Sequence, residues 1–255
     1  MTSTIIVIDG SIGVGQSNLL NSLKVHNLFD SDNCYFYDQT FDDYEDGGEI
    51  TIEQFYHNPT SNYYRFQKQV IKTLKVNFTH PECNNTGTIH FHDSHLISCL
   101  AYCRAGRNMG YISNAQYVKL KSKIRNILNH YPNQIPQYVI RLFSTTRSTL
   151  NSIRRRGRRC EVRISREYLQ SIANSQLYWL EKLERSYGIK CFSVLIDEVD
   201  TDLVIIDKVW DELQSFTDKN GFPLFEREEG IFYKVVAMVL LLLLGNHQSY
   251  FSIRA

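Results

Sequence analysis

The residues best suited to chemistry near the amino terminus form a glycine-rich segment, Gly-Ser-Ile-Gly-Val-Gly-Gln-Ser. This segment matches the phosphate-binding loop pattern G-x-x-x-x-G-K-[ST] at every fixed position except one. Its glycines let backbone N–H groups turn toward phosphate oxygens, and the hydroxyl of Ser17 can reach a magnesium ion. Gln16 stands where the pattern has lysine, so the loop lacks the charge that contacts the transferring phosphoryl group. A glycine-rich turn without a ligand is the alternative to a phosphate-binding loop made of Gly10, Ser11, Ile12, Gly13, Val14, Gly15, Gln16 and Ser17.

A second candidate for phosphate chemistry is a cluster of five arginines within the six residues from Arg154 to Arg159. Taken alone, such a cluster is typical of a localisation signal or a nucleic-acid contact. The whole chain, however, carries 28 Lys and Arg residues against 27 Asp and Glu residues, for a net charge of +1. This balance argues against a protein whose entire surface binds nucleic acid or an acidic membrane. The positive charge is concentrated locally, which raises the question of a phosphate site.

The elements that would position these residues alternate along most of the chain. Short apolar runs predict five strands, at Thr4–Asp9, Asn33–Tyr37, Thr88–His92, Tyr138–Phe143 and Cys191–Asp197. Helical periods predict helices at Ser17–Leu23, Glu49–Val76, Leu96–Arg104, Asn114–His130, Arg147–Arg156, Ser165–Tyr187 and Asp200–Ser215. Strands separated by helices predict a three-layer α/β domain with a five-stranded parallel sheet. The glycine-rich segment then lies between a strand and a helix, as phosphate binding requires.

The remaining composition bounds the domain organisation and the compartment. Without a repeat or linker, residues 1–215 are expected to form one domain, and residues 216–255 an extension packed on it. Six scattered cysteines without a C-x-x-C pair indicate reduced thiols. The amino terminus has no positive n-region, so we expect a cytoplasmic protein. The apolar run Val235–Leu244 is shorter than the ~20 residues that cross a bilayer. It predicts a buried helix, with an interfacial or tail-type membrane anchor as the alternative.

Several segments, in the same order and with similar spacing, resemble the deoxynucleoside kinase family over roughly residues 4–215. The arginine-rich segment Ser152–Leu169 is similar to the family's lid, which has the pattern R-x-R-x-E-E before a tyrosine-leucine helix start. The segments Tyr56–Pro59 and Phe66–Gln67 resemble the helix that carries nucleoside-binding residues. His92–His95 stands where cellular members have E-R-S and herpesvirus-type thymidine kinases have D-R-H. The resemblance implies a P-loop kinase fold with helices on both sides of the sheet and an arginine-rich lid.

Carried over position by position, the resemblance implies a nucleoside site. Phe66 and Tyr102 would sandwich the nucleobase, and Gln67 would offer a donor and an acceptor to a pyrimidine edge. Ser98 falls where a charged residue would favour cytosine or purines, so a small residue there points to a thymidine-type pyrimidine. Tyr56 and Glu161 would hold the sugar 3′-hydroxyl. The nucleoside-binding residues that the resemblance implies are therefore Tyr56, Phe66, Gln67, Ser98, Tyr102 and Glu161.

The resemblance also implies a phosphate site that works with ATP and Mg²⁺. Arg156 and Arg158 would close over the phosphates, because planar guanidinium groups match phosphate oxygens. Asp38 would be the general base that accepts the proton of the 5′-hydroxyl. Ser17 and Asp93 would be the magnesium ligands.

The chain departs from the family pattern at positions that carry charge. Gln16 replaces the loop lysine, and the motif after the third strand lacks its arginine. If His92 aligns with the acidic residue of that motif, the arginine position is Asp93; if Asp93 aligns with it, the arginine position is Ser94. The first alignment keeps the spacing to Tyr102, and the second keeps the acidic residue that helps to hold magnesium. Both alignments stay open.

These departures leave the function between two classes. Two lost positive charges weaken a transition state that is stabilised mainly by electrostatics, although spare lid arginines can partly replace them. The chain is therefore either a kinase that transfers the γ-phosphate of ATP to the 5′-hydroxyl of a thymidine-type deoxynucleoside, or a catalytically inactive kinase-derived binding or regulatory protein. A nucleic-acid-binding protein is a third and weaker hypothesis. Family members commonly form homodimers, which we expect here, and for a viral protein the compartment would be the host cytoplasm. Neither nucleic acid nor a membrane is expected as a partner.

Overall fold

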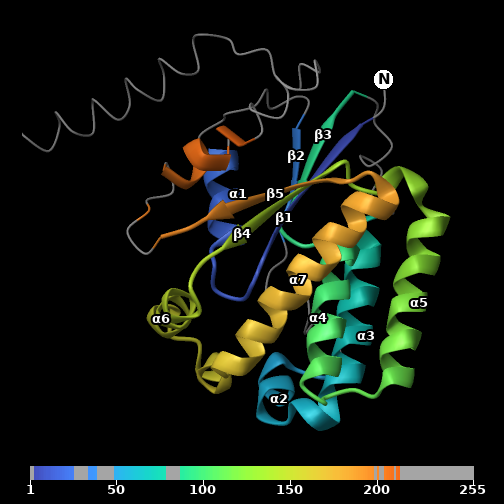
Figure 1. The fold of residues 1–255 in the computed structure, drawn as a ribbon, viewed down its shortest axis with the longest axis vertical. Coiled ribbons are helices and arrows are strands. Elements are labelled where there is room, and N and C mark those ends of the chain that lie inside the picture. Colours follow the sequence, from blue (N-terminus) through green and yellow to red (C-terminus); the bar gives the residue numbers. More distant parts are fainter. Residues whose placement is uncertain are drawn as a thin grey trace, which may run out of the picture. The chain divides into compact units, whose positions relative to one another are not determined.

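The β-branched runs of the sequence form a five-stranded sheet in the computed structural model (Figure 1). The strands are β1 (Thr4–Gly10), β2 (Cys34–Tyr37), β3 (Ile89–His92), β4 (Tyr138–Phe143) and β5 (Lys190–Leu195). Their order across the sheet is β2-β3-β1-β4-β5, and all neighbouring strands are parallel. The predicted α/β class and parallel sheet are confirmed, and each strand lies within two residues of its predicted ends.

The structure describes residues 3–25, 34–38, 49–78, 87–197, 200, 204–209 and 211–212. They belong to the compact unit Met1–Glu212. Of the predicted helix Asp200–Ser215, residues 204–209 and 211–212 are helical. The apolar run Val235–Leu244 and the predicted extension 216–255 lie outside the described residues. Within the described residues, no helix is both long enough and apolar enough to cross a membrane.

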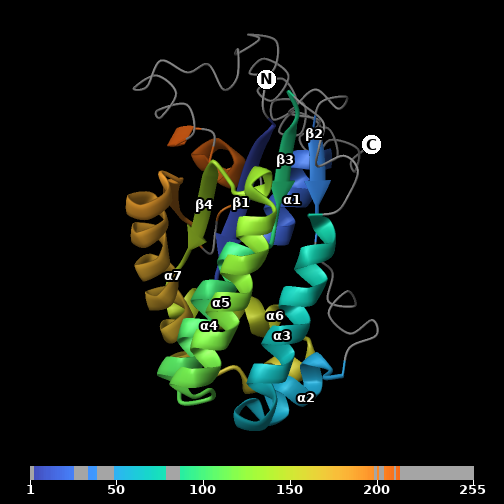
Figure 2. The ribbon, with the colours of Figure 1, turned by 90° about the vertical axis from the view of Figure 1, so that its right-hand side faces the viewer.

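Helices cover both faces of the sheet (Figures 1 and 2). They are α1 (Gln16–Val25), α2 (Ile52–His57), α3 (Pro59–Asn77), α4 (Leu96–Asn108), α5 (Asn114–His130), α6 (Thr146–Arg156) and α7 (Arg166–Tyr187), with 3-10 turns η3 (Pro132–Gln134) and η4 (Arg159–Arg163). One face is covered by α4, which packs against α3, α5 and α7, and α1 lies on the other face. Successive side chains of β1 point to opposite faces of the sheet. Ile5 and Val7 therefore share one face, where they pack in an apolar cluster with Ile97 of α4 and Leu180 of α7.

Helix ends follow short capping side chains. Thr51 and Ser113 each form a capping box with a glutamine three residues later, at the starts of α2 and α5. The hydroxyl of Ser165 accepts a hydrogen bond from the N–H of Tyr168 and begins α7. Gly157 ends α6 with φ 70°, a left-handed conformation that favours glycine. The chain can therefore leave α6 sharply and enter η4, the part of the lid that carries Glu161.

The long helix predicted over Glu49–Val76 is wrong, because the structure breaks it at Pro59. Proline has no N–H and disfavours helical angles in the residue before it. Asn58 accordingly has φ −140° and ψ 79°, and its side chain accepts a hydrogen bond from the N–H of Ser61. Asn58 thus ends α2 and begins α3. The break directs α2 toward the lid, where it contacts η4.

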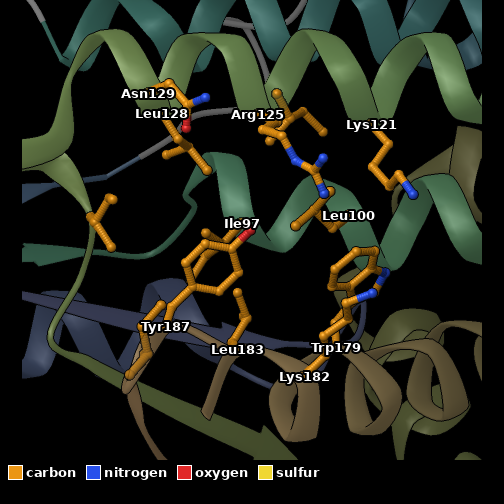
Figure 3. Close-up of a pocket in the computed structure, with 13 residues that line it drawn as sticks. Ile97, Leu100, Lys121, Arg125, Leu128, Asn129, Trp179, Lys182, Leu183 and Tyr187 are labelled. Atoms are coloured by element: carbon orange, nitrogen blue, oxygen red, sulfur yellow. The ribbon is translucent and has the colours of Figure 1, made fainter. Parts of the chain in front are cut away.

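The two faces of α4 have different surroundings. Ile97 and Leu100 point into a small apolar pocket of about 50 Å³ that is also lined by Trp179 of α7 and Leu128 of α5 (Figure 3). Ser98 and Tyr102 line a separate cavity on the side of the sheet where the strands end. The packing of α4 between α5 and α7 therefore fixes the two residues that the sequence assigned to nucleoside binding.

Aromatic and histidine rings are stacked between β2 and β3. The parallel register pairs Tyr35 with His90 and Tyr37 with His92, and the ring centroids of these pairs lie 5.2 Å and 4.5 Å apart. The neighbouring His95 begins α4: its Nδ1 accepts a hydrogen bond from the N–H of Ile97 at 3.2 Å, and its Nε2 donates to the carbonyl of Gln134 at 3.1 Å. These bonds require a neutral ring that is protonated at Nε2.

Replacing His95 with asparagine should flatten the dependence of stability on pH. Burial lowers the pKa of His95 from 6.5 to about 3, so between these values the unfolded chain binds a proton that the folded chain excludes. Stability from the neutral ring is therefore complete above pH 6.5 and falls as the pH drops, by about 1.4 kcal/mol per pH unit. The asparagine keeps a capping acceptor but does not titrate. Urea unfolding at about pH 8 and about pH 5 measures the difference.

Other buried groups also contribute to the pH dependence, but they are common to both proteins. Burial lowers the pKa of His92 in the same direction, whereas burial raises the pKa of Asp9 to about 6, so the folded state gains a proton there as the pH falls. Equal losses of stability on acidification in wild type and His95→Asn would contradict the assignment.

Candidate functional site

The glycine-rich segment forms a tight turn between β1 and α1. Gly13 and Gly15 have φ angles of 83° and 108°, which L side chains rarely adopt. The N–H of Val14 donates to the carbonyl of Ser11 at 3.2 Å. A Cβ on Gly10 would lie only 2.4 Å from Cγ1 of Val14. The backbone has the compact shape that lets N–H groups at the start of a helix face an anion, and phosphate binding stays a prediction.

A buried carboxylate that the sequence analysis did not single out holds the start of this loop. Asp9 accepts hydrogen bonds at Oδ1 from the N–H of Gly10 at 2.9 Å and from Nε2 of Gln176 at 3.4 Å. Burial raises the pKa of Asp9 to about 6, although the Gly10 N–H and the charge of Arg141 act in the opposite direction. The available signal was an aspartate that interrupts an apolar strand directly before the first glycine.

Gln16, which replaces the loop lysine, turns back onto the loop. Its Nε2 donates a hydrogen bond to the carbonyl of Gly10 at 2.8 Å. The hydroxyl of Tyr102 donates to the same carbonyl at 3.4 Å. The neutral amide therefore closes the loop on itself and supplies no positive charge to a bound phosphate.

The structure decides which residue of the motif after β3 faces the loop. Oδ2 of Asp93 accepts a hydrogen bond from Oγ of Ser17 at 2.8 Å. His92 instead lies within the sheet, 1% exposed and stacked on Tyr37. Tyr102 also lines the cavity, so Asp93 faces Ser17 although one residue is missing between Asp93 and Tyr102 relative to the viral motif. Ser94 lines the same cavity in the place of the arginine that this motif would have.

The pair formed by Ser17 and Asp93 suits a magnesium ion. A hydroxyl and a carboxylate oxygen are the hard ligands that Mg²⁺ prefers, and the ion usually completes its octahedral shell with substrate phosphates and water. Both residues line the cavity beside the loop, so these substrate ligands can reach them. The predicted metal ligands thus fit the group.

Most of the predicted site residues surround one cavity of about 190 Å³. It extends from the loop to the lid between α2, α3 and α4. The predicted residues that line it are Gly13, Gln16, Ser17, Tyr56, Phe66, Gln67, Asp93, Ser98, Tyr102, Arg156, Arg158 and Glu161, together with Ile12. Asp38 does not line it: this residue is exposed directly after β2. The hydrogen bond from the N–H of Asp93 to the carbonyl of Tyr37, 3.2 Å, nevertheless places the end of β2 beside Asp93.

One end of the cavity is aromatic. Phe66 stacks on Phe55 with ring centroids 4.4 Å apart, which orients Phe66 along the cavity wall. The hydroxyl of Tyr63 donates to the carbonyl of Tyr102 at 2.7 Å and lies 3.1 Å from that of Tyr168. Phe55 and Tyr168 also line the cavity but were not assigned to it from the sequence. In the sequence, Phe55 directly precedes Tyr56, and Tyr168 lies within the segment that resembles the lid; these positions were the only indication that the two residues belong to the cavity.

The lid side of the cavity is charged. Nε and Nη2 of Arg156 donate to both carboxylate oxygens of Glu161 at 2.6–3.0 Å, and Nη1 of Arg158 lies 3.6 Å from Oε1. Glu161 is 2% exposed, so the two guanidinium groups compensate a charge that is removed from water. Burial, and then the nearby Tyr168 and Glu161, raise the pKa of Tyr56 well above its usual value. The hydroxyl of Tyr56 therefore stays protonated and available as a donor.

A second cavity of about 390 Å³ also borders the glycine-rich loop. Its wall includes the loop residues Gly13, Val14 and Gly15, and the helix α6 residues Thr149, Ser152, Arg155 and Arg156. Arg156 lines both cavities. The arrangement therefore offers space for two ligands beside the loop, with the guanidinium group of Arg156 at the boundary.

Comparisons with known proteins agree with this geometry. A sequence model described as deoxynucleoside kinase matches residues 6–219. Two similar solved structures are the deoxyadenosine kinase from M. mycoides with bound dCTP (TM-score 0.64) and the same enzyme with bound dATP (TM-score 0.62). Each is 16% identical to this chain, and the match covers 83% of this chain and 100% of the other. No curated protein sequence matches.

The contact between the loop and α6 gives a test of this architecture. A Cβ on Gly13 would lie 2.6 Å from Cγ1 of Ile153, whereas a Cβ on Gly15 would meet nothing within 4 Å. Both positions have positive φ, so Gly15→Ala should cost about 1–2 kcal/mol of stability, and Gly13→Ala about 1–3 kcal/mol more through overpacking. Urea unfolding compares them. As a further check, Ile153→Ala should cost less in the Gly13→Ala background, and equal costs in both backgrounds would contradict the contact.

Proposed function

Because the chain belongs to the deoxynucleoside kinase family, we propose that it transfers the γ-phosphate of ATP to the 5′-hydroxyl of a deoxynucleoside, with thymidine as the preferred type. The observation that carries this proposal is the single cavity that joins aromatic residues at one end to the glycine-rich loop and Asp93 at the other. The groups of a nucleoside follow the same order, with a flat base at one end and a reactive hydroxyl at the other.

The cavity residues define how the nucleoside would lie. The base would stack between Phe66 and Tyr102, and Gln67 would bond to its edge. Ser98 brings no charge near the base, which favours a thymidine-type pyrimidine over bases that pair with a charged group. The sugar 3′-hydroxyl would lie between Tyr56 and Glu161, since a protonated phenol donates and a carboxylate accepts. This orientation directs the 5′-hydroxyl toward the loop.

The second cavity would hold ATP with its phosphates along the loop. The nucleoside 5′-oxygen forms a bond to the γ-phosphorus while the bond from that phosphorus to the β,γ-bridging oxygen breaks. ADP leaves with the electron pair, and the hydroxyl proton passes to Asp38 and from there to water. When bound, Mg²⁺ held by Ser17 and Asp93 supplies positive charge to the phosphate oxygens. Arg156 and Arg158 stabilise the charge that develops between the two substrates.

Two observations favour the alternative of an inactive binding or regulatory protein. Gln16 bonds to Gly10 in place of the lysine contact, and both Nε and Nη2 of Arg156 are bonded to Glu161. A nucleoside would still bind, but phosphoryl transfer would be slow. A homodimer, which the family resemblance implies, and a cytoplasmic location, which the amino terminus predicts, remain predictions.

The full-length protein with radiolabelled ATP, Mg²⁺ and each of the four deoxynucleosides gives the direct test. We expect thymidine-dependent formation of the 5′-monophosphate and a rise of at least about tenfold in kcat for Gln16→Lys, because a single phosphate-contacting cation can be worth about 10³-fold or more. Asp93→Asn should reduce the rate in both backgrounds. Nucleoside-dependent stabilisation without turnover, even in Gln16→Lys, would favour the inactive alternative. No change of melting temperature with millimolar nucleoside, with or without ATP and magnesium, would exclude both.

The sugar contact is tested with thymidine and 3′-deoxythymidine. Tyr56→Phe removes one hydroxyl, so it should weaken thymidine binding by about five- to tenfold, which corresponds to one hydrogen bond, and leave 3′-deoxythymidine binding unchanged. Calorimetric titration measures both affinities. Tyr64→Phe is the matched control, because Tyr64 is half-buried on α3 and does not line the cavity. Equal losses for the two ligands would show that Tyr56 does not contact the 3′-hydroxyl.

A further inference from the structure

The lid helix α6 is fixed against the glycine-rich loop. A Cβ on Gly13 would lie 2.6 Å from Cγ1 of Ile153 and 3.4 Å from the carbonyl oxygen of Thr149, so backbone and helix touch at this point. Residues of α6 that flank Ile153 therefore lie next to the loop. This is the place from which a cation could reach phosphates held by the loop.

The five arginines of the cluster have different surroundings. Arg156 and Arg158 line the nucleoside cavity and pair with Glu161. Arg154 and Arg159 are exposed and line neither of the two cavities. Arg155 lines the second cavity together with the loop residues Gly13, Val14 and Gly15. Among the five arginines of the cluster, Arg155 is thus the one that lies beside these loop residues and takes no part in the interaction with Glu161.

The charge of Arg155 is available. Its Nη2 donates to the neutral hydroxyl of Ser152 at 3.3 Å, and no described carboxylate lies within ion-pair distance of it. Asp197 and Asp200 line the same cavity, but Nζ of Lys208 lies 3.8 Å from Asp197 and 2.6 Å from Asp200. Lys208 therefore offsets the carboxylates that would otherwise pair with Arg155 or repel a phosphate.

We propose that Arg155 supplies the positive charge that Gln16 does not, by contacting the β- and γ-phosphates of ATP from the α6 side of the loop. The inference rests on the proposed function, because it assigns the donor phosphates to the second cavity. A planar guanidinium group can bind two phosphate oxygens at once. It approaches from α6 rather than from α1, so the loop can keep its bond between Gln16 and Gly10 while ATP is bound.

A purely structural role for Arg155 makes a different prediction. Cations in the last turn of a helix favour the carbonyl end of its dipole, and Arg154, Arg155 and Arg156 all occupy that turn of α6. A dipole interaction would be shared by Arg154 and would affect stability rather than phosphate affinity. Arg154→Ala is therefore the matched control, since it removes the same charge from the same turn.

The experiment compares Arg155→Ala, Arg155→Lys and Arg154→Ala, each with Gln16 and with Gln16→Lys, in the full-length protein. We expect Arg155→Ala to lower kcat/KM for ATP by at least about tenfold, as loss of a phosphate-contacting cation does, with KM for thymidine unchanged. Arg155→Lys should retain part of the rate, and Arg154→Ala should stay within about twofold of wild type. In the Gln16→Lys background the cost of Arg155→Ala should shrink to less than about threefold, because both cations serve the same phosphates.

Calorimetric titration with ADP and with AMP separates this inference from the proposed function. Arg155→Ala should weaken ADP binding and leave AMP binding unchanged, since AMP lacks the β-phosphate. If wild type has no kinase activity, the proposed function fails while a selective loss of ADP affinity still supports the role of Arg155. Equal effects of Arg155→Ala and Arg154→Ala, equal costs with Gln16 and Gln16→Lys, equal losses for ADP and AMP, or no ADP binding by wild type would each overturn it.

Discussion

The parallel pairing of β1 with both β3 and β4 is the constraint on which the site depends. In a parallel sheet, all strands end at the same edge, so the segments that follow them meet there. The glycine-rich loop follows β1, Asp38 follows β2, Asp93 follows β3, and α6 begins shortly after β4. The hydrogen bond between Ser17 and Asp93, 76 residues apart, is a direct result of this register. If β3 were antiparallel to β1, these groups would lie at opposite edges.

Two further contacts turn this edge into two separate cavities. Gly13 against Ile153 fixes α6 on the loop, and Glu161 with Arg156 ties the end of α6 to η4. The wall between the cavities is thus made of the loop and one guanidinium group. Because Glu161 is buried, removal of Arg156 would leave a carboxylate compensated only by Arg158 at 3.6 Å. The same pair therefore serves the stability of the lid and the position of a charge at the boundary.

The balance of charge is more uneven than the net value of +1 suggests. No Asp or Glu occurs between Asp93 and Glu161 in the sequence, a stretch that includes α4, α5, β4 and α6. The lid arginines therefore have few acidic neighbours along the chain, and Glu161 is the carboxylate that organises them. A phosphate entering beside α6 meets cations from the lid, while Lys208 offsets the acids beyond β5. This distribution explains how a nearly neutral chain can concentrate positive charge beside the glycine-rich loop.

The sequence by itself determined the parallel α/β fold, the position of the glycine-rich loop and most of the predicted site residues that gather around the cavity between the loop and the lid, because apolar periods, caps and motif spacing depend on neighbours along the chain. It did not predict the break at Pro59, although that signal was local. Only the tertiary structure decided that Asp93 rather than His92 faces Ser17, that Gln16 turns onto Gly10, and which of the lid arginines line a cavity. These outcomes depend on contacts between segments far apart in sequence, and their directions are set by how α4 and α6 pack on the sheet.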